Sequence, residues 1–237
     1  MTAIISGPAV DPLSPINASL AIIRQRHGED SLQGLVPGLR AGRAAWPSAA
    51  VLLTADGMAD FLATAAQRWN AQPHAAAALA WKCYSYWLAL PAVTGYAAAR
   101  RVPIMTPSEV LVQYSPRPPF VRLGLRDPLV VEDASLATLR SSVLDEHLLP
   151  LIEQIQTHVH LGTRTLLGSV ASGTAYALSR AGLAAQAPEV LAALGVEDLV
   201  ELTPQPDGQA RIHRKTCCLA FTLPTPKVCS GCCIRNT

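Results

Sequence analysis

Five of the six cysteines of this chain lie close to its C-terminus. Cys217 and Cys218 are adjacent, ten residues follow, and Cys229 and Cys232 form a Cys-x-x-Cys pair with Cys233 directly behind it. A Cys-x-x-Cys turn brings two thiolates within reach of one metal ion. We expect the ten-residue excursion, which contains two prolines, to fold back as a hairpin and bring the first two thiols to the same place. The spacing therefore predicts a site made of four thiolates.

Zinc and an iron–sulfur cluster are both compatible with such a donor set. A structural zinc site usually takes its cysteines from two Cys-x-x-Cys-like turns, whereas one pair here is adjacent in sequence. Adjacent Cα atoms lie about 3.8 Å apart, and in a strand their side chains point to opposite faces. Both thiols can reach one metal ion only if the backbone kinks. A two-iron cluster also takes four thiolates and offers more attachment geometries because it is larger, so both alternatives stay open at this point.

The start of the chain indicates the compartment in which these thiols work. No Lys or Arg precedes Arg24, and three prolines interrupt the first fifteen residues. The charged and apolar regions of a secretory signal are therefore missing, which predicts a cytoplasmic protein with reduced thiols. The longest uncharged run, residues 83–99, is short and polar for a bilayer span of about 20 residues. We interpret it as a pair of core helices, with a peripheral membrane contact as the alternative.

The charge balance argues against nucleic acid as a partner. The chain has 19 Lys and Arg against 17 Asp and Glu, a net charge of only +2, so no whole face can attract a polyanion. The basic character is concentrated in residues 206–237, which hold five Lys and Arg against Asp207 alone. We expect these cations to surround the thiolates, where they can raise a redox potential or dock an anionic partner.

The rest of the chain predicts a mainly α protein, α+β at most. Alanine, a strong helix former, is the commonest residue. Apolar residues recur at helical spacing in several segments, which predicts helices over 56–70, over 74–90 with a break or kink at Pro91, over about 25 residues from Ser135, after Gly162, and between Pro188 and Gly195. The proline-rich stretch 101–119 predicts a long loop, and residues 120–131 alternate weakly as in one or two short strands.

Two regions follow from this pattern. Residues 1–205 are predicted to form a helical body. Residues 203–208 are interpreted as a linker, and residues 206–237 as a C-terminal metal-binding segment with a short strand or hairpin character. Several residues are given plain structural interpretations: Cys83 as a small buried hydrophobic residue, the four tryptophans as core, and His147, His158 and His160 as core or solvated histidines.

Three segments resemble the FhuF-like ferric-siderophore reductases. The sequence HRKTCCL at residues 213–219, followed at the same distance by Cys229-x-x-Cys232, is similar to the C-terminal cluster motif of that family. Residues 164–172, RTLLGSVAS, resemble its R-x-L-W-G-N-V-A-S helix, and residues 75–84 resemble its helix that ends in K-R-Y. The chain departs from the family at three places: Ser230-Gly231 replaces Gly-Asp, Leu167-Gly168-Ser169 replaces Trp-Gly-Asn, and Cys233 is an extra thiol.

The resemblance implies a cytoplasmic oxidoreductase with a [2Fe-2S] cluster on Cys217, Cys218, Cys229 and Cys232. Its substrate would be a ferric siderophore of the hydroxamate type, bound by the helical body of residues 1–205. One-electron reduction of this substrate would release Fe(II). No dinucleotide fingerprint is present, so the electrons are expected from a separate donor. Two alternatives of other classes remain: a zinc-stabilised, non-enzymatic protein whose tryptophan-lined helices bind a ligand, and an electron-transfer or iron-sensing module without a siderophore site.

Overall fold

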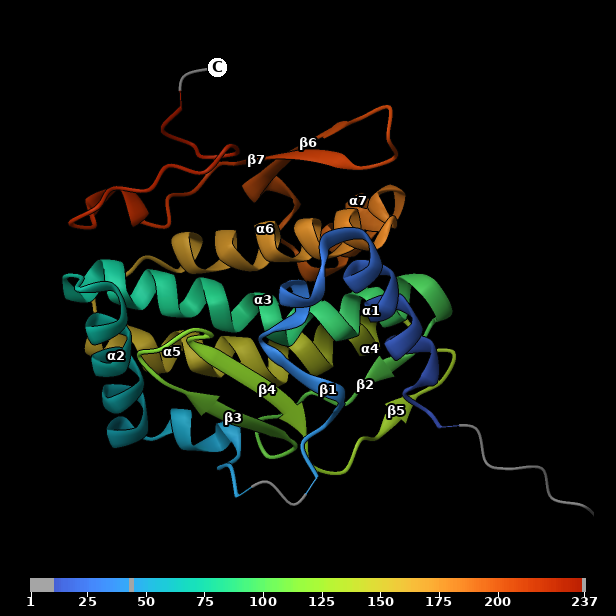
Figure 1. Cartoon of the computed structure of the whole chain (residues 1–237), viewed down its shortest axis with the longest axis horizontal. Helices are drawn as coiled ribbons and strands as arrows, with labels where there is room; N and C mark the ends of the chain where they lie inside the picture. The colour runs from blue at the N-terminus through green and yellow to red at the C-terminus, as the bar shows by residue number, and fades with distance from the viewer. Residues whose placement is uncertain (1–10, 43–44, 236–237) are drawn as a thin grey trace, which may run out of the picture.

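The structure, a computed structural model, describes residues 11–42 and 45–235. The fold is mainly α with three small β-sheets, as the sequence predicts (Figure 1). One long helix, α3 (Pro73–Ala99), runs through the middle of the molecule. It packs most extensively against α6 (Thr163–Ala181), and also against α1 (Ser14–His27) and α2 (Ala55–Trp69). Residues 1–10, on which the absence of a secretory signal rests in part, lie outside the described residues.

Helix α3 continues through Pro91, so the predicted break into two helices is wrong. Proline removes one helical hydrogen bond and crowds the preceding turn. Here Pro91 is buried, and so are all residues from Leu88 to Tyr96. Burial of this apolar segment between neighbouring elements offsets the cost of the missing hydrogen bond. Because residues 88–96 are buried, this part of the helix has no exposed apolar face for the alternative interpretation, a peripheral membrane contact.

Helices α2 and α6 begin where their sequences indicate, and α2 also ends at the predicted residue. The Thr54 side chain accepts a hydrogen bond from the Gly57 amide at 3.1 Å, which satisfies a free N–H at the start of α2. Asn70 ends that helix in the left-handed conformation. The small residues of α6 let it approach α3 closely, and Gly173 lies against Tyr86 of α3. A short helix, α7 (Ala187–Leu194), then ends at Gly195, as predicted.

The long helix predicted from Ser135 is present as three consecutive segments. They are α4 (Leu136–Arg140), a π-helical segment η3 (Ser141–Leu148) and α5 (Leu149–His158). A π-helical segment has i→i+5 hydrogen bonds in place of the α-helical i→i+4 pattern, and His147 in this segment is completely buried. Short 3-10 helices complete the helical elements: η1 (Glu29–Leu32), η2 (Ala49–Leu53), η4 (Ala184–Gln186), η5 (Glu197–Leu199) and η6 (Ala220–Thr222).

The main sheet lies on the side of α3 away from α6 (Figure 1). Its strand order is β1 (Leu35–Arg40), β4 (Val121–Leu125), β3 (Val110–Tyr114), with β1 parallel and β3 antiparallel to β4. A second pair joins β2 (Val102–Pro103) to β5 (Val130–Val131). The strands predicted in 120–131 are therefore confirmed. The predicted long loop over 101–119 is wrong. None of its prolines lies within 110–114, so this stretch can pair with β4 as strand β3.

A β-hairpin connects the helical body to the cysteine-rich segment. Strand β6 (Val200–Pro204) pairs with β7 (Ala210–Arg214), and the predicted linker 203–208 is the end of β6 and the turn of this hairpin. The division at residue 205 thus falls inside the hairpin turn. The hairpin precedes the cysteines, whereas the excursion 219–228 contains only η6 and no strand. None of the described helices has the length and apolar character needed to cross a bilayer.

Candidate metal centre

The cysteine-rich segment, residues 215–235, is anchored on α6 and β7 by close backbone approaches. The Arg214 amide donates to the Gly231 carbonyl at 2.9 Å. A Cβ atom added to Gly231 would lie 1.9 Å from the Ile212 carbonyl oxygen, and a Cβ atom added to Gly168 would lie 1.9 Å from the Thr216 hydroxyl. Only glycine fits at both positions. The glycine in the family-like motif 164–172 therefore has a packing role, since it lets the segment rest on α6.

The Cys233 thiol lies near the thiols of Cys217 and Cys232. Burial is the largest cause that raises the pKa of Cys233 to about 11, and the neighbouring thiols of Cys217 and Cys232 raise it further. The Cys232 amide donates to the Cys229 carbonyl at 3.1 Å, which closes the Cys-x-x-Cys turn. The extra cysteine, Cys233, thus lies close to two predicted ligands, Cys217 and Cys232.

Cys218 points instead toward α3. It is buried in a small apolar cluster with Leu79, Ala220 and Leu223. Burial opposes ionisation of the thiol, but Lys82 is the strongest of several groups that together bring the pKa of Cys218 below its ordinary value. The adjacent cysteines therefore face different neighbours, as alternation along an extended chain predicts.

The backbone turns sharply directly after this pair. Leu219 has a φ of 59°, in the left-handed region that non-glycine residues rarely adopt. Its amide donates to the Cys217 sulfur at 3.3 Å. Hydrogen bonds from amides to sulfur stabilise thiolates and tune iron–sulfur sites. The kink that a shared metal site requires is thus present next to the adjacent cysteines.

In the described part of the chain, no three Cys, His, Asp or Glu side chains are gathered closely enough to hold a metal ion. The ligand set Cys217, Cys218, Cys229 and Cys232 therefore stays a prediction. The donor chemistry nevertheless fits a cluster, because five thiols without disulfide partners share this segment. The positive charge near these thiols fits a cluster as well.

Arg214 is the most unusual charged residue near the thiols. Its side chain is only 2% exposed, and its single hydrogen bond is donated by Nη2 to the Ser169 hydroxyl at 3.3 Å. Nε and Nη1 are buried without a partner among the described residues. A buried cation without a counter-ion is costly. A cluster held by thiolates is negatively charged and would supply the missing partner.

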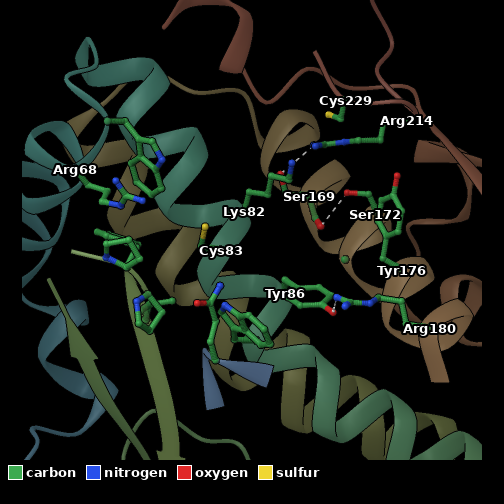
Figure 2. Close-up of a pocket in the computed structure, with 18 residues that line it drawn as sticks. Arg68, Lys82, Cys83, Tyr86, Ser169, Ser172, Tyr176, Arg180, Arg214 and Cys229 are labelled. Carbon is green, nitrogen blue, oxygen red and sulfur yellow. Dashed lines mark hydrogen bonds between the residues drawn. The ribbon is translucent and has the colours of Figure 1, made fainter. Parts of the chain in front are cut away.

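The other cations predicted around the thiols are mostly solvent-exposed. Arg211, Lys215, Lys227 and Arg235 are exposed, and His213 is half-buried. Arg214 alone among the Lys and Arg residues of 206–235 is buried, and Figure 2 shows it beside Cys229. Cys229 also faces Tyr176, whose pKa is raised by burial and further by the nearby Cys229 sulfur.

A cavity of about 490 Å³ opens where Cys229 and Arg214 meet the helical body (Figure 2). It lies between α2, α3, α6 and the chain before β4, and Arg68, Lys82 and Arg180 line it with Arg214. The roles of Arg68 and Arg180 could not be predicted from the sequence, because nothing in local spacing indicates that these residues line one cavity. Trp69 and Trp87 are half-buried and line this cavity, whereas Trp81 is buried in the core as predicted.

The remaining candidate residues have structural surroundings. Cys83 is half-buried at the cavity wall and is therefore not the fully buried residue that was predicted. Burial of its thiol raises its pKa to about 11. The ring of His147 is held by the Met105 carbonyl, which accepts from Nδ1, and by the Tyr84 hydroxyl, which donates to Nε2 at 2.7 Å. This confirms His147 as a core histidine.

Comparison of the chain with protein-family models and with curated proteins gives no match. The resemblance to FhuF-like reductases therefore rests on the motifs themselves.

Proposed function

We propose that this protein is a ferric-siderophore reductase of the FhuF-like type, with a [2Fe-2S] cluster on Cys217, Cys218, Cys229 and Cys232. The observation that carries the proposal is the position of Arg214. This buried guanidinium has two unpartnered nitrogens and lies between the cysteine-rich segment and a cavity of ligand-binding size. The same residue can therefore compensate the negative charge of a thiolate-bound cluster and border the site of a bound chelate.

The chemistry requires a single electron. Oxygen donors of siderophores bind Fe(III) tightly, and reduction to Fe(II) gives a softer ion that such hard donors hold weakly. When bound, the cluster would supply one electron at a time at a potential set by its ligands, hydrogen bonds and surroundings. A separate donor protein or reductant returns the electron, and the proposed compartment is the cytoplasm, where thiols stay reduced.

The residues of the chain have distinct roles in this proposal. The amide of Leu219 and the cations Lys82 and Arg214 stabilise thiolates in the segment. Cys229 lines the cavity, so a chelate bound there lies next to a predicted ligand. Gly168 and Gly231 keep the segment against α6 and β7 and thereby keep Cys229 at the cavity.

Anaerobic purification, followed by a visible spectrum and analysis of iron, sulfide and zinc, tests the proposal. We expect a coloured protein with iron and acid-labile sulfide in equal amounts, whose visible absorbance falls when the protein is reduced and returns when a ferric chelate is added to the reduced protein. A colourless protein with bound zinc would refute the reductase and favour the zinc-stabilised binding protein. A coloured protein that reduces no ferric chelate would favour the electron-transfer or iron-sensing module.

A further inference from the structure

The cavity beside Cys229 is lined by cations and by no acidic residue. Arg68 comes from α2, Lys82 from α3, Arg180 from α6 and Arg214 from β7, and all four contribute to its wall. In Figure 2 Lys82 and Arg214 lie near Cys229, Arg68 lies on the opposite side of the view, and Arg180 lies beside Tyr86. Four positive charges from four elements make the cavity electropositive in a protein whose net charge is only +2.

These charges are not neutralised by the protein. Over residues 11–42 and 45–235, the ion pairs involve none of the four cations. Arg214 has two unpartnered nitrogens and Arg68 has a buried, unpartnered Nε. Arg180 donates to the neutral Tyr86 hydroxyl at 3.1 Å. Arg214 is buried, and Arg68, Lys82 and Arg180 are half-buried. Because a buried charge is costly when unpaired, the unpartnered nitrogens of Arg214 and Arg68 indicate an anionic ligand.

Aromatic rings form the other walls of the cavity. Trp69 and Phe120 lie with ring centroids 4.8 Å apart, and Tyr86 and Trp87 are also 4.8 Å apart in an edge-to-face arrangement. Arg68 lies over the Trp69 ring at 5.9 Å. Aromatic side chains in a binding site can stack on a planar π system, and guanidinium groups also stack on aromatic faces. The walls therefore suit a ligand that is aromatic as well as anionic.

We propose that this cavity binds a catecholate-type ferric chelate, an inference that rests on the proposed reductase function. Each catecholate arm brings two negative charges, so its Fe(III) complex keeps net negative charge. Each hydroxamate brings one, so a trihydroxamate neutralises Fe(III) at the metal centre and offers no aromatic ring. Four unpaired cations and paired aromatic walls favour the catecholate, and the substrate class thus differs from the hydroxamate type implied by the family resemblance.

The two ends of the cavity have different roles. Arg214 and Lys82 lie at the end that meets the cysteine-rich segment, where Cys229 borders the cavity. The anionic metal centre of the chelate binds at this end, next to the thiols. Arg180 and Tyr86 lie farther along α6 and α3 and contact a peripheral ring. A volume of about 490 Å³ accommodates a drug-sized ligand, so the remaining part of a large siderophore extends into solvent.

Gallium(III) chelates test this inference without any redox step, because gallium(III) resembles Fe(III) but is not reduced. Binding of Ga(III) tris-catecholate and of a Ga(III) trihydroxamate to the full-length protein is measured by tryptophan fluorescence and by calorimetry near physiological ionic strength. We expect the catecholate chelate to bind at least tenfold more tightly. Equal affinities, or tighter binding of the trihydroxamate, would overturn the inference. Tighter binding of ATP, which is also anionic and aromatic, would overturn it too.

Charge removal at Arg180 separates electrostatic recognition from general damage. Arg180→Gln should weaken binding of the catecholate chelate about tenfold and leave the trihydroxamate unchanged. Arg126→Gln, which removes an exposed cation outside the cavity, should change neither affinity. An equal loss for both chelates in Arg180→Gln would count against recognition of charge. Binding of the gallium chelates requires no electron transfer. If a protein without iron binds the catecholate chelate, the reductase is refuted but this inference is not. If an iron–sulfur protein binds neither chelate, this inference alone is refuted.

Discussion

Thr216 of the cysteine-rich segment rests directly on Gly168 of α6, with no room for a side chain between them. A Cβ atom at position 168 would lie 1.9 Å from the Thr216 hydroxyl and 2.6 Å from its methyl group. The Thr216 hydroxyl is buried without a hydrogen-bond partner among the described residues. This contact controls how closely the thiols approach the helical body.

Gly168→Ala should displace the segment. We expect a loss of about 1–3 kcal/mol in the free energy of unfolding, as for other overpacked sites, and faster alkylation of the buried Cys218 thiol. Gly173→Ala in the same helix is the matched control, because its Cβ meets nothing closer than 3.4 Å and alanine favours helix. Urea unfolding and alkylation kinetics of both variants decide the point. Equal alkylation rates would show that Gly168 does not hold the segment in place.

Cysteine variants test the ligand assignment. Cys229→Ser should remove the visible absorbance of the anaerobically purified protein and abolish ferric reduction, because one of four predicted ligands is lost. Cys233→Ser should keep nearly all of the absorbance, and Cys83→Ser at the cavity wall serves as the control. Iron content and the visible spectrum are the measurements. If Cys233→Ser loses its colour while Cys232→Ser keeps it, the fourth ligand is Cys233.

Arg214→Met should affect the metal-free and metal-loaded proteins in opposite directions. Without a bound anion the buried guanidinium lacks a counter-ion, so its replacement should leave the free energy of unfolding unchanged or raise it by about 1–3 kcal/mol. In the loaded protein the same variant should lose iron to a chelator several-fold faster. Arg211→Met, at an exposed position of β7, is the control for both measurements. Strong destabilisation of the metal-free variant would contradict this account.

The buried pair of Tyr84 and His147 makes stability depend on pH. Burial lowers the pKa of His147 to about 4 from an ordinary value of 6.5, so the unfolded chain binds a proton more readily than the folded protein. The stabilisation is complete above pH 6.5 and is lost as the pH falls toward 4. We expect a loss of about 2 kcal/mol between pH 7 and pH 5 from this residue.

Urea unfolding at both pH values measures this effect in the wild-type protein and in His147→Gln. The variant should be less stable at pH 7, because the hydrogen bonds to Tyr84 and Met105 are weakened. Its stability should also fall less between pH 7 and pH 5. An unchanged pH dependence in the variant would exclude His147 as the titrating group.

Local sequence signals predicted most helices correctly. The helix that begins after Thr54, the small-residue helix after Gly162 and the short helix that ends at Gly195 all follow from side chains and backbone preferences within a few residues. The continuation of α3 beyond Pro91 and the strand β3 could not be predicted in this way. Burial on all sides carries α3 through Pro91, and β3 forms because Val110–Tyr114 pairs with β4.

The sequence by itself determined which chemical groups are present: five thiols at fixed spacing, with basic residues concentrated around them. Only the tertiary structure decided where those groups point. Cys217 lies near Cys233, whereas Cys218 is buried against Leu79 of α3, and the backbone turns at Leu219 directly after the pair. Arg68, Lys82, Arg180 and Arg214 meet because α2, α3, α6 and β7 pack around one cavity. Spacing along a chain reports only local geometry, whereas contacts between distant residues depend on the packing of whole elements.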